Sequence, residues 1–153
     1  MLRLLALSAA LAAPMVDVPK LFEDQLPRVK ERSEVPVLLP QRMPDQFDDY
    51  FPTGSGSQRR WGLQLGAVKG CGGATACFIA SFSAREQGRP FGPRRVELAR
   101  GRSGRFKPLT CGASCAPPTV EWRERGALYR IEAKVRGGQL LRMANSAIRN
   151  GPR

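Results

Sequence analysis

Four cysteines in two close pairs are the residues of this chain best suited to chemistry. Five residues separate Cys71 from Cys77, and three separate Cys111 from Cys115. Four cysteines can bind zinc, but the usual zinc spacing is CxxC twice, and neither pair has that spacing. A CxxC redox motif is absent for the same reason.

Disulfides are the better interpretation of these cysteines. Four cysteines allow three pairings, which sequence alone does not distinguish, but proximity favours Cys71 with Cys77 and Cys111 with Cys115. In the chain-entropy model each small ring stabilises the fold by roughly 2 kcal/mol, against roughly 4 kcal/mol for a long crossing bridge. The expected disulfides therefore pin loops more than they hold the domain together.

The chain contains no histidine, which excludes Ser/His/Asp and Cys/His catalysis and imidazole metal sites. An enzyme would then need a carboxylate pair facing across a cleft, and no spacing of acids indicates one. Glu121, Glu124 and Glu132 fall within a predicted hairpin whose arginines already match them. An envelope hydrolase using a carboxylate pair is kept as the alternative function.

Two further motifs are too incomplete to predict a ligand. Asp45, Asp48 and Asp49 could bind calcium, but the oxygen-rich run with its fixed glycine is missing. Gly70–Gly73 is not followed by the Lys-Ser/Thr of a phosphate-binding loop. We therefore predict no catalytic, metal-binding or cofactor-binding residue, and no cofactor.

The amino terminus predicts export. Arg3 precedes an apolar run, Leu4–Leu11, that ends in a small-x-small cleavage pattern at Ala10-Leu11-Ala12. Residues 1–13 are therefore predicted to be a signal peptide, and the protein to be periplasmic or extracellular, where disulfides form. No later stretch has the ~20 apolar residues needed to span a bilayer, so no transmembrane segment is expected.

Positive charge is concentrated in the second part of the chain. The net charge is +12, but residues 14–57 carry 5 basic and 8 acidic side chains, whereas residues 58–153 carry 19 and 5. Such a surplus attracts polyanions. For an exported protein we expect the partner to be an anionic envelope component or another envelope protein, and not nucleic acid. A solvated basic face without a dedicated ligand is the competing interpretation.

Prolines are frequent in the part of the chain that precedes Trp61. Residues 14–34 are predicted to be a flexible leader rich in proline and charge, and residues 35–150 a single α+β domain. Val35–Pro40 has strand-forming residues, but its prolines favour an edge strand or an extended arm, the edge being preferred. Thr53–Ser57 is predicted to be a loop because it contains only glycine, serine and threonine.

Alternation of apolar and polar residues predicts several strands after this point. They cover Trp61–Leu65, Phe78–Phe82, Val96–Leu98 and Arg105–Lys107, and Thr119–Val135 is predicted to be a hairpin turning at Gly126. The aromatic residues of these strands are predicted to be core rather than a stacking platform. They are Trp61, Phe78, Phe82, Phe106, Trp122 and Tyr129.

A helix is predicted to follow the hairpin. Leu140, Ala144, Ala147 and Ile148 have helical spacing, and Asn150-Gly151-Pro152 ends the pattern. Packing on a sheet is favoured over a membrane-surface role. The expected fold is α+β: a small antiparallel sheet of about six strands packed by one C-terminal helix, with disulfide-stapled loops.

Part of this pattern resembles a known family. Val120-Glu121-Trp122, Tyr129 and Leu141–Ile148 resemble an uncharacterised family of exported bacterial domains in which an IEW…G…Y hairpin precedes a helix ending in ANSI-like residues. Val37–Pro40 with Met43-Pro44 is similar to the opening of such domains. The resemblance implies an antiparallel sheet with a C-terminal helix and no activity. We expect a non-enzymatic binding or structural module of the cell envelope.

Overall fold

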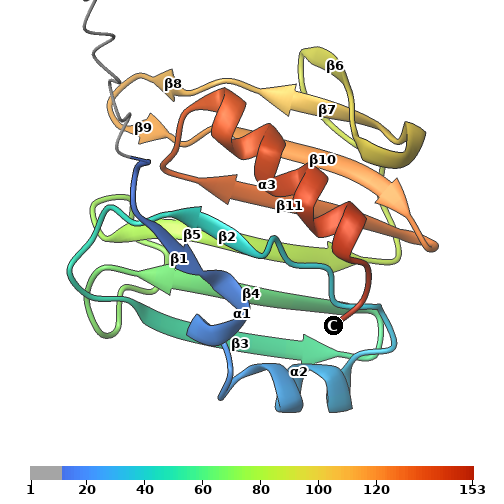
Figure 1. Cartoon of the computed structure of the whole chain (residues 1–153), viewed down its shortest axis with the longest axis horizontal. Coiled ribbons are helices and arrows are strands. Elements are labelled where there is room, and N and C mark those ends of the chain that lie inside the picture. Colours follow the sequence, from blue (N-terminus) through green and yellow to red (C-terminus); the bar gives the residue numbers. More distant parts are fainter. Residues whose placement is uncertain (1–11) are drawn as a thin grey trace, which may run out of the picture.

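The computed structural model describes residues 12–153, and its main feature is a seven-stranded antiparallel sheet in the order β3-β4-β5-β11-β10-β7-β6 (Figure 1). The strands of this sheet are β3 (Phe51–Ser57), β4 (Arg60–Gly66), β5 (Phe78–Arg85), β6 (Arg94–Glu97), β7 (Ser103–Lys107), β10 (Thr119–Glu124) and β11 (Ala127–Ala133). The other elements are β1 (Met15–Asp17), β2 (Arg42–Pro44), β8 (Thr110–Cys111), β9 (Cys115–Ala116), α1 (Val18–Leu21), α2 (Leu26–Arg32), η1 (Ala99–Gly101) and α3 (Gly137–Asn150).

The predicted α+β class, with its antiparallel sheet and single C-terminal helix, is confirmed. The sheet has seven strands where about six were expected. The predicted signal peptide lies outside the described residues apart from Ala12 and Ala13.

Within the seven-stranded sheet, the strand that the sequence does not predict is β3, which includes the expected loop Thr53–Ser57. It pairs with β4 along its whole length. Its neighbours approach so closely that a Cβ on Gly54 would lie 2.9 Å from Leu63 Cδ2, and a Cβ on Gly56 would lie 3.2 Å from the Val29 carbonyl oxygen. The glycines of β3 therefore permit close packing rather than forming a loop.

The hydrophobic core lies on the face of the sheet that α3 and the N-terminal elements cover (Figure 1). In the register of β4 with β5, the large side chains of Trp61 and Leu65 lie opposite the small Ala84 and Ala80, on either side of the Leu63–Phe82 pair. The six aromatic residues predicted to be core are all buried, which confirms that prediction: Trp61, Phe78, Phe82, Phe106, Trp122 and Tyr129.

The hairpin and the helix form as predicted. The hairpin β10–β11 turns at Arg125 and Gly126, which both have positive φ (52° and 74°). Helix α3 ends before Gly151, whose φ of 69° is a conformation that suits glycine. Among residues 12–153, no helix combines the length and apolar character needed to cross a bilayer.

Val35–Pro40 is an extended arm and not an edge strand. Trp61 Nε1 and Tyr129 Oη both donate hydrogen bonds to the Pro36 carbonyl oxygen, at 3.2 Å and 2.8 Å. Leu39 is fully buried. Side chains from the sheet thus bind the backbone of an arm whose prolines cannot donate ladder hydrogen bonds.

Residues 14–34 differ from the flexible leader that their composition predicts. Val18, Phe22 and Val29 are at most 1% exposed and belong to the same hydrophobic cluster as the sheet. Pro19 and Pro27 lie within the first two positions of α1 and α2, where the missing N–H would have no helical partner. The prolines therefore begin these helices instead of preventing them.

Candidate functional site

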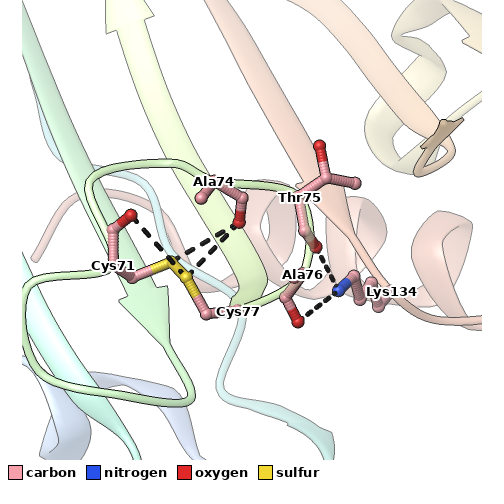
Figure 2. Close-up of a disulfide and its surroundings, with 6 residues drawn as sticks. All are labelled: Cys71, Ala74, Thr75, Ala76, Cys77 and Lys134. Carbon is pink, nitrogen blue, oxygen red and sulfur yellow. Dashed lines mark hydrogen bonds between the residues drawn. A yellow bond between two sulfur atoms is a disulfide. The ribbon is translucent and has the colours of Figure 1, made fainter.

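Both predicted disulfides are present, and no cysteine is free. Cys71–Cys77 closes the loop between β4 and β5, with its Cα atoms 5.8 Å apart (Figure 2). Cys111–Cys115 joins β8 to β9, with its Cα atoms 4.0 Å apart. All four sulfur atoms are used in covalent bonds that fix loops, so none is a thiolate available for catalysis or metal binding.

The two disulfide loops lie at the same end of the sheet (Figure 1). Lys134, directly after β11, donates from Nζ to the carbonyl oxygens of Thr75 at 2.6 Å and Ala76 at 3.5 Å, which holds the first loop beside that strand (Figure 2). The second loop lies between β7 and β10, and β10 is the neighbour of β11. Residues 70–84 and 108–120, which contain these loops, carry no charged side chain. Lys69 and Lys107 flank these uncharged runs, and Lys134 is bonded to the first loop.

The opposite end of the sheet is rich in arginine. It consists of the β3–β4 turn, the residues after β5, the segment around η1 and the β10–β11 turn. We name this region the arginine end. It contains eight arginines and three glutamates: Arg59, Arg60, Arg85, Arg89, Arg100, Arg102, Arg123 and Arg125, with Glu86, Glu97 and Glu124.

Arg60 and Arg85 form a cross-strand pair within the arginine end. They begin β4 and end β5, lie directly opposite each other in the register, and are exposed. Among the described residues neither makes an ion pair. Both line two cavities, one of about 480 Å³ that also includes Arg59 and Glu86, and one of about 260 Å³ that also includes Glu121. Because like charges directly opposite each other repel, this pair is an uncompensated concentration of positive charge beside a hollow in the surface.

Hydrogen bonds fix the turn beside this pair. The Glu86 N–H donates to the Arg59 carbonyl oxygen at 3.0 Å, which joins the ends of β4 and β5. Arg123 donates from Nη1 to the Gly88 carbonyl oxygen at 2.6 Å and from Nη2 to that of Glu86 at 3.3 Å. The carboxylate of Glu86 lies 3.6 Å from Arg59 Nε. The scaffold that presents Arg60 and Arg85 is thus ordered by contacts that do not use their guanidinium groups.

Residues 86–93 cross the sheet face that α3 does not cover, and they bury part of the hairpin. Glu121 Oε2 accepts a hydrogen bond from the Phe91 N–H at 2.6 Å, and Glu121 Oε1 lies 3.5 Å from Arg130 Nη1. Glu121 is 6% exposed, although the sequence predicts it on the solvent face of the hairpin. Both its oxygens have partners, so Glu121 lacks the free carboxylate that acid–base catalysis would use.

The carboxylate-pair alternative gains no support from the cavities. Each of the five main cavities in residues 12–153 is lined by at most one acidic residue. No group of three or more acidic or cysteine side chains converges in this part of the chain. Asp45 instead accepts a hydrogen bond from Tyr50 Oη at 2.7 Å. The aspartates considered for calcium are therefore not gathered into a site.

The largest cavity, of about 780 Å³, lies near the start of α3 at the disulfide end. Its lining is mainly proline and other apolar residues, such as Pro108, Leu109 and Pro118. Lys134, which also lines it, is already bonded to the first disulfide loop. Size alone does not make this cavity the better candidate, because within residues 12–153 Arg136 is the one basic residue of its lining that is not already bonded, whereas the smaller cleft has both Arg60 and Arg85.

Comparisons of the chain with protein-family profiles, with curated proteins and with solved structures found no significant similarity. The resemblance to a family of exported bacterial domains stays a prediction. The arginine end must therefore be interpreted from its own geometry.

Sequence reasoning finds the basic surplus but does not single out Arg60 and Arg85. The available signal is positional: Arg60 directly precedes the alternation Trp61–Leu65, and Arg85 follows that of Phe78–Phe82 after Ser83 and Ala84. In consecutive antiparallel strands, the first residue of one lies beside the last of the next. That rule could have placed the two arginines together once the strand ends were known.

Proposed function

We propose that this protein is an exported, non-enzymatic binding module of the cell envelope that contacts an anionic polymer or lipid headgroup through its arginine end. The observation that carries this proposal is the Arg60–Arg85 pair, which is exposed and has no acidic partner among the described residues. Two like charges on directly opposite strand positions reduce stability. An anionic ligand would relieve that repulsion.

The distribution of charge supports contact through one end of the molecule. The arginine end has eight arginines against three glutamates, whereas the disulfide loops at the other end lie in uncharged runs. A surface field of one sign concentrated at one end would attract and orient the protein toward a polyanion. The disulfides and the predicted signal peptide support an exported location, where envelope polyanions are the accessible partners.

Cosedimentation with lipid vesicles tests the proposal. The mature protein should bind vesicles of equal parts phosphatidylglycerol and phosphatidylcholine, and not vesicles of phosphatidylcholine alone. Binding should fall steeply as ionic strength rises from about 0.1 M to 1 M, because the Debye length shortens from about 10 Å to 3 Å. Anionic polysaccharide immobilised on beads provides the polymer counterpart. Salt-insensitive binding, or no binding to either material, would contradict the proposal.

A matched pair of double variants separates the arginine end from net charge. Arg60→Gln with Arg85→Gln removes two charges from the arginine end. Arg42→Gln with Arg142→Gln removes two charges from exposed positions on β2 and α3, which lie beside a different cavity. The first variant should bind anionic vesicles much more weakly than the second. Equal losses in both variants would mean that only total charge matters and that the arginine end is not the contact surface.

A further inference from the structure

We infer that Arg60 and Arg85 form a binding site for a phosphoryl group, in the cleft that they line with Arg59 and the 86–88 turn. This inference rests on the proposed function and names the anionic group that the arginine end recognises. Positive charge alone is not sufficient for such a site, because the phosphoryl group would be bound by two guanidinium groups acting together.

Strand register brings the two arginines within reach of one small anion. Arg60 and Arg85 are cross-strand neighbours on the sheet face that α3 does not cover, and the Cβ atoms of such neighbours are ~4.5–5.5 Å apart. Their side chains therefore begin at adjacent points and extend over the same cleft of about 480 Å³. A third arginine, Arg59, lines the same cleft and already has Glu86 as a partner.

The number of oxygens favours a phosphoryl group over a carboxylate. A guanidinium presents a planar fork of N–H donors that binds two oxygens side by side. A carboxylate has two oxygens and satisfies one fork. A phosphate monoester has three terminal oxygens and a diester has two, arranged tetrahedrally about the phosphorus atom, so a monoester can present a pair of oxygens to one fork and its third oxygen to a second fork. A pair of uncompensated arginines thus matches tetrahedral phosphorus chemistry better than a planar acid.

Because Gly88 has no side chain, the guanidinium of Arg85 can pack against the 86–88 turn. Gly88 has a φ of 109°, and a Cβ built there would lie 3.1 Å from Arg85 Nη2 and 3.2 Å from Arg85 Nε. Another residue at this position would be strained at this φ, and its Cβ would displace the Arg85 guanidinium by a few tenths of an ångström. Arg123 fixes the same turn through the carbonyl oxygens of Gly88 and Glu86. The backbone around the cleft is therefore shaped to accommodate the guanidinium of Arg85.

The cleft is open to solvent, since Arg59, Arg60 and Arg85 are all exposed. A phosphoryl group that is part of a larger molecule can enter such a cleft as well as a free anion. Free phosphate, a phosphate-linked polymer and a phospholipid headgroup share this chemistry, and the experiment separates them.

Thermal unfolding with three phosphoryl probes tests the inference. Inorganic phosphate, glycerol phosphate and phosphatidylglycerol vesicles represent the free anion, the polymer unit and the lipid. Phosphate and glycerol phosphate should raise the unfolding midpoint more than acetate or chloride at equal ionic strength, because a ligand that binds only the folded state stabilises it. NMR signals of the Nε–H groups of Arg60 and Arg85 should shift in the same titrations. Equal stabilisation by acetate and phosphate would overturn the inference.

Charge-conserving variants separate fork recognition from simple attraction. Arg60→Lys with Arg85→Lys keeps the net charge but removes both forks, and it should bind phosphate about tenfold or more weakly than the wild type. Arg42→Lys with Arg142→Lys is the control and should bind phosphate normally. Circular dichroism verifies that both variants are folded. Unchanged phosphate affinity in the Arg60/Arg85 variant would overturn the inference.

The outcomes also distinguish this inference from the proposed function. If vesicle binding is salt-dependent but phosphate is not preferred over acetate, the phosphoryl site is wrong and the proposed function stands. If phosphate binds at Arg60 and Arg85 but neither vesicles nor polymer bind, the phosphoryl site stands for a free anion and the proposed function is wrong.

Discussion

The Arg60–Arg85 pair should cost the protein stability, and this cost can be measured. Arg85→Gln should raise the free energy of unfolding by up to about 1 kcal/mol at low ionic strength, because a like-charge cross-strand pair is removed. The gain should shrink as salt screens the repulsion. Urea unfolding at two ionic strengths measures both effects. A loss of stability in Arg85→Gln would show that the guanidinium makes a favourable contact that outweighs the repulsion.

A double-mutant cycle sharpens this test. Arg60→Gln alone should stabilise the protein like Arg85→Gln, but the two together should stabilise it by less than the sum, because the repulsion can be removed only once. Arg42→Gln, at an exposed position on β2, should leave stability nearly unchanged. The variants that lose anion binding would then be the more stable ones, a trade between function and stability.

The raised pKa of Tyr129 predicts how the free energy of unfolding changes at alkaline pH. Burial, with a smaller contribution from the charge of Glu124, raises the pKa of Tyr129 above the usual value of about 10. The folded protein therefore keeps the phenolic proton at a pH where the unfolded chain loses it. Since the unfolded state then binds fewer protons, the free energy of unfolding should fall as pH rises above about 10.

Tyr129→Phe isolates this effect. At neutral pH the variant should be about 1 kcal/mol less stable, because the hydrogen bond to the Pro36 carbonyl oxygen is lost. Between about pH 9 and 11 its stability should fall less steeply than that of the wild type. Urea unfolding across this range measures both. Identical slopes would mean that the Tyr129 hydroxyl ionises as easily in the folded protein as in the unfolded chain.

Helix α3 shows at the scale of an element why the ANS sequence within it matters. Asn145 Oδ1 accepts a hydrogen bond from the Ala99 N–H at 2.7 Å, and Ser146 Oγ accepts one from the Gln41 N–H at 3.0 Å. One turn of the helix thus binds the backbone of η1 on one side and of the segment before β2 on the other. The residues that carry the family resemblance have a structural role in positioning α3.

Asn145→Ala and Ser146→Ala should each destabilise the protein by about 1–2 kcal/mol, because each leaves a backbone N–H without its partner. Chemical denaturation measures these changes, with Arg142→Ala on the exposed side of α3 as the control. Stability equal to that of the control would argue against this role.

The elements that could be predicted from sequence are those whose own residues show strand-like alternation or helical spacing of apolar side chains. Alternation within Trp61–Leu65, and helical spacing from Leu140 to Ile148, are visible without knowledge of neighbours. Strand β3 and the two N-terminal helices could not be predicted in this way. The glycines of β3 indicate a strand only once it is known that Val29 of α2 packs against them. Phe22 is buried because residues distant in the sequence pack around it. The candidate site belongs to the second kind, since it depends on a register between two strands.

At the scale of the whole molecule, the sheet separates two ends of different chemistry. One end carries both disulfides in loops whose one charged side chain is Lys69, and the other carries eight arginines. A disulfide that closes a small ring stabilises the fold less than a long crossing bridge, so the two disulfides mainly fix their own loops, which carry little charge. In the proposed function, the arginine end attracts polyanions at the cost of repulsion between its own arginines. This asymmetry predicts one orientation on an anionic surface.

Hydrogen–deuterium exchange on anionic vesicles tests that orientation. With phosphatidylglycerol vesicles, backbone amides of residues 58–60 and 85–90 should exchange more slowly than in the free protein, because these turns face the surface. Residues 67–77 and 108–118, in the disulfide loops, should exchange at the same rate in both states. High salt should abolish the protection, since exposed charges are then screened. Protection of the disulfide loops instead would mean that the disulfide end contacts the vesicle and that the arginine end does not.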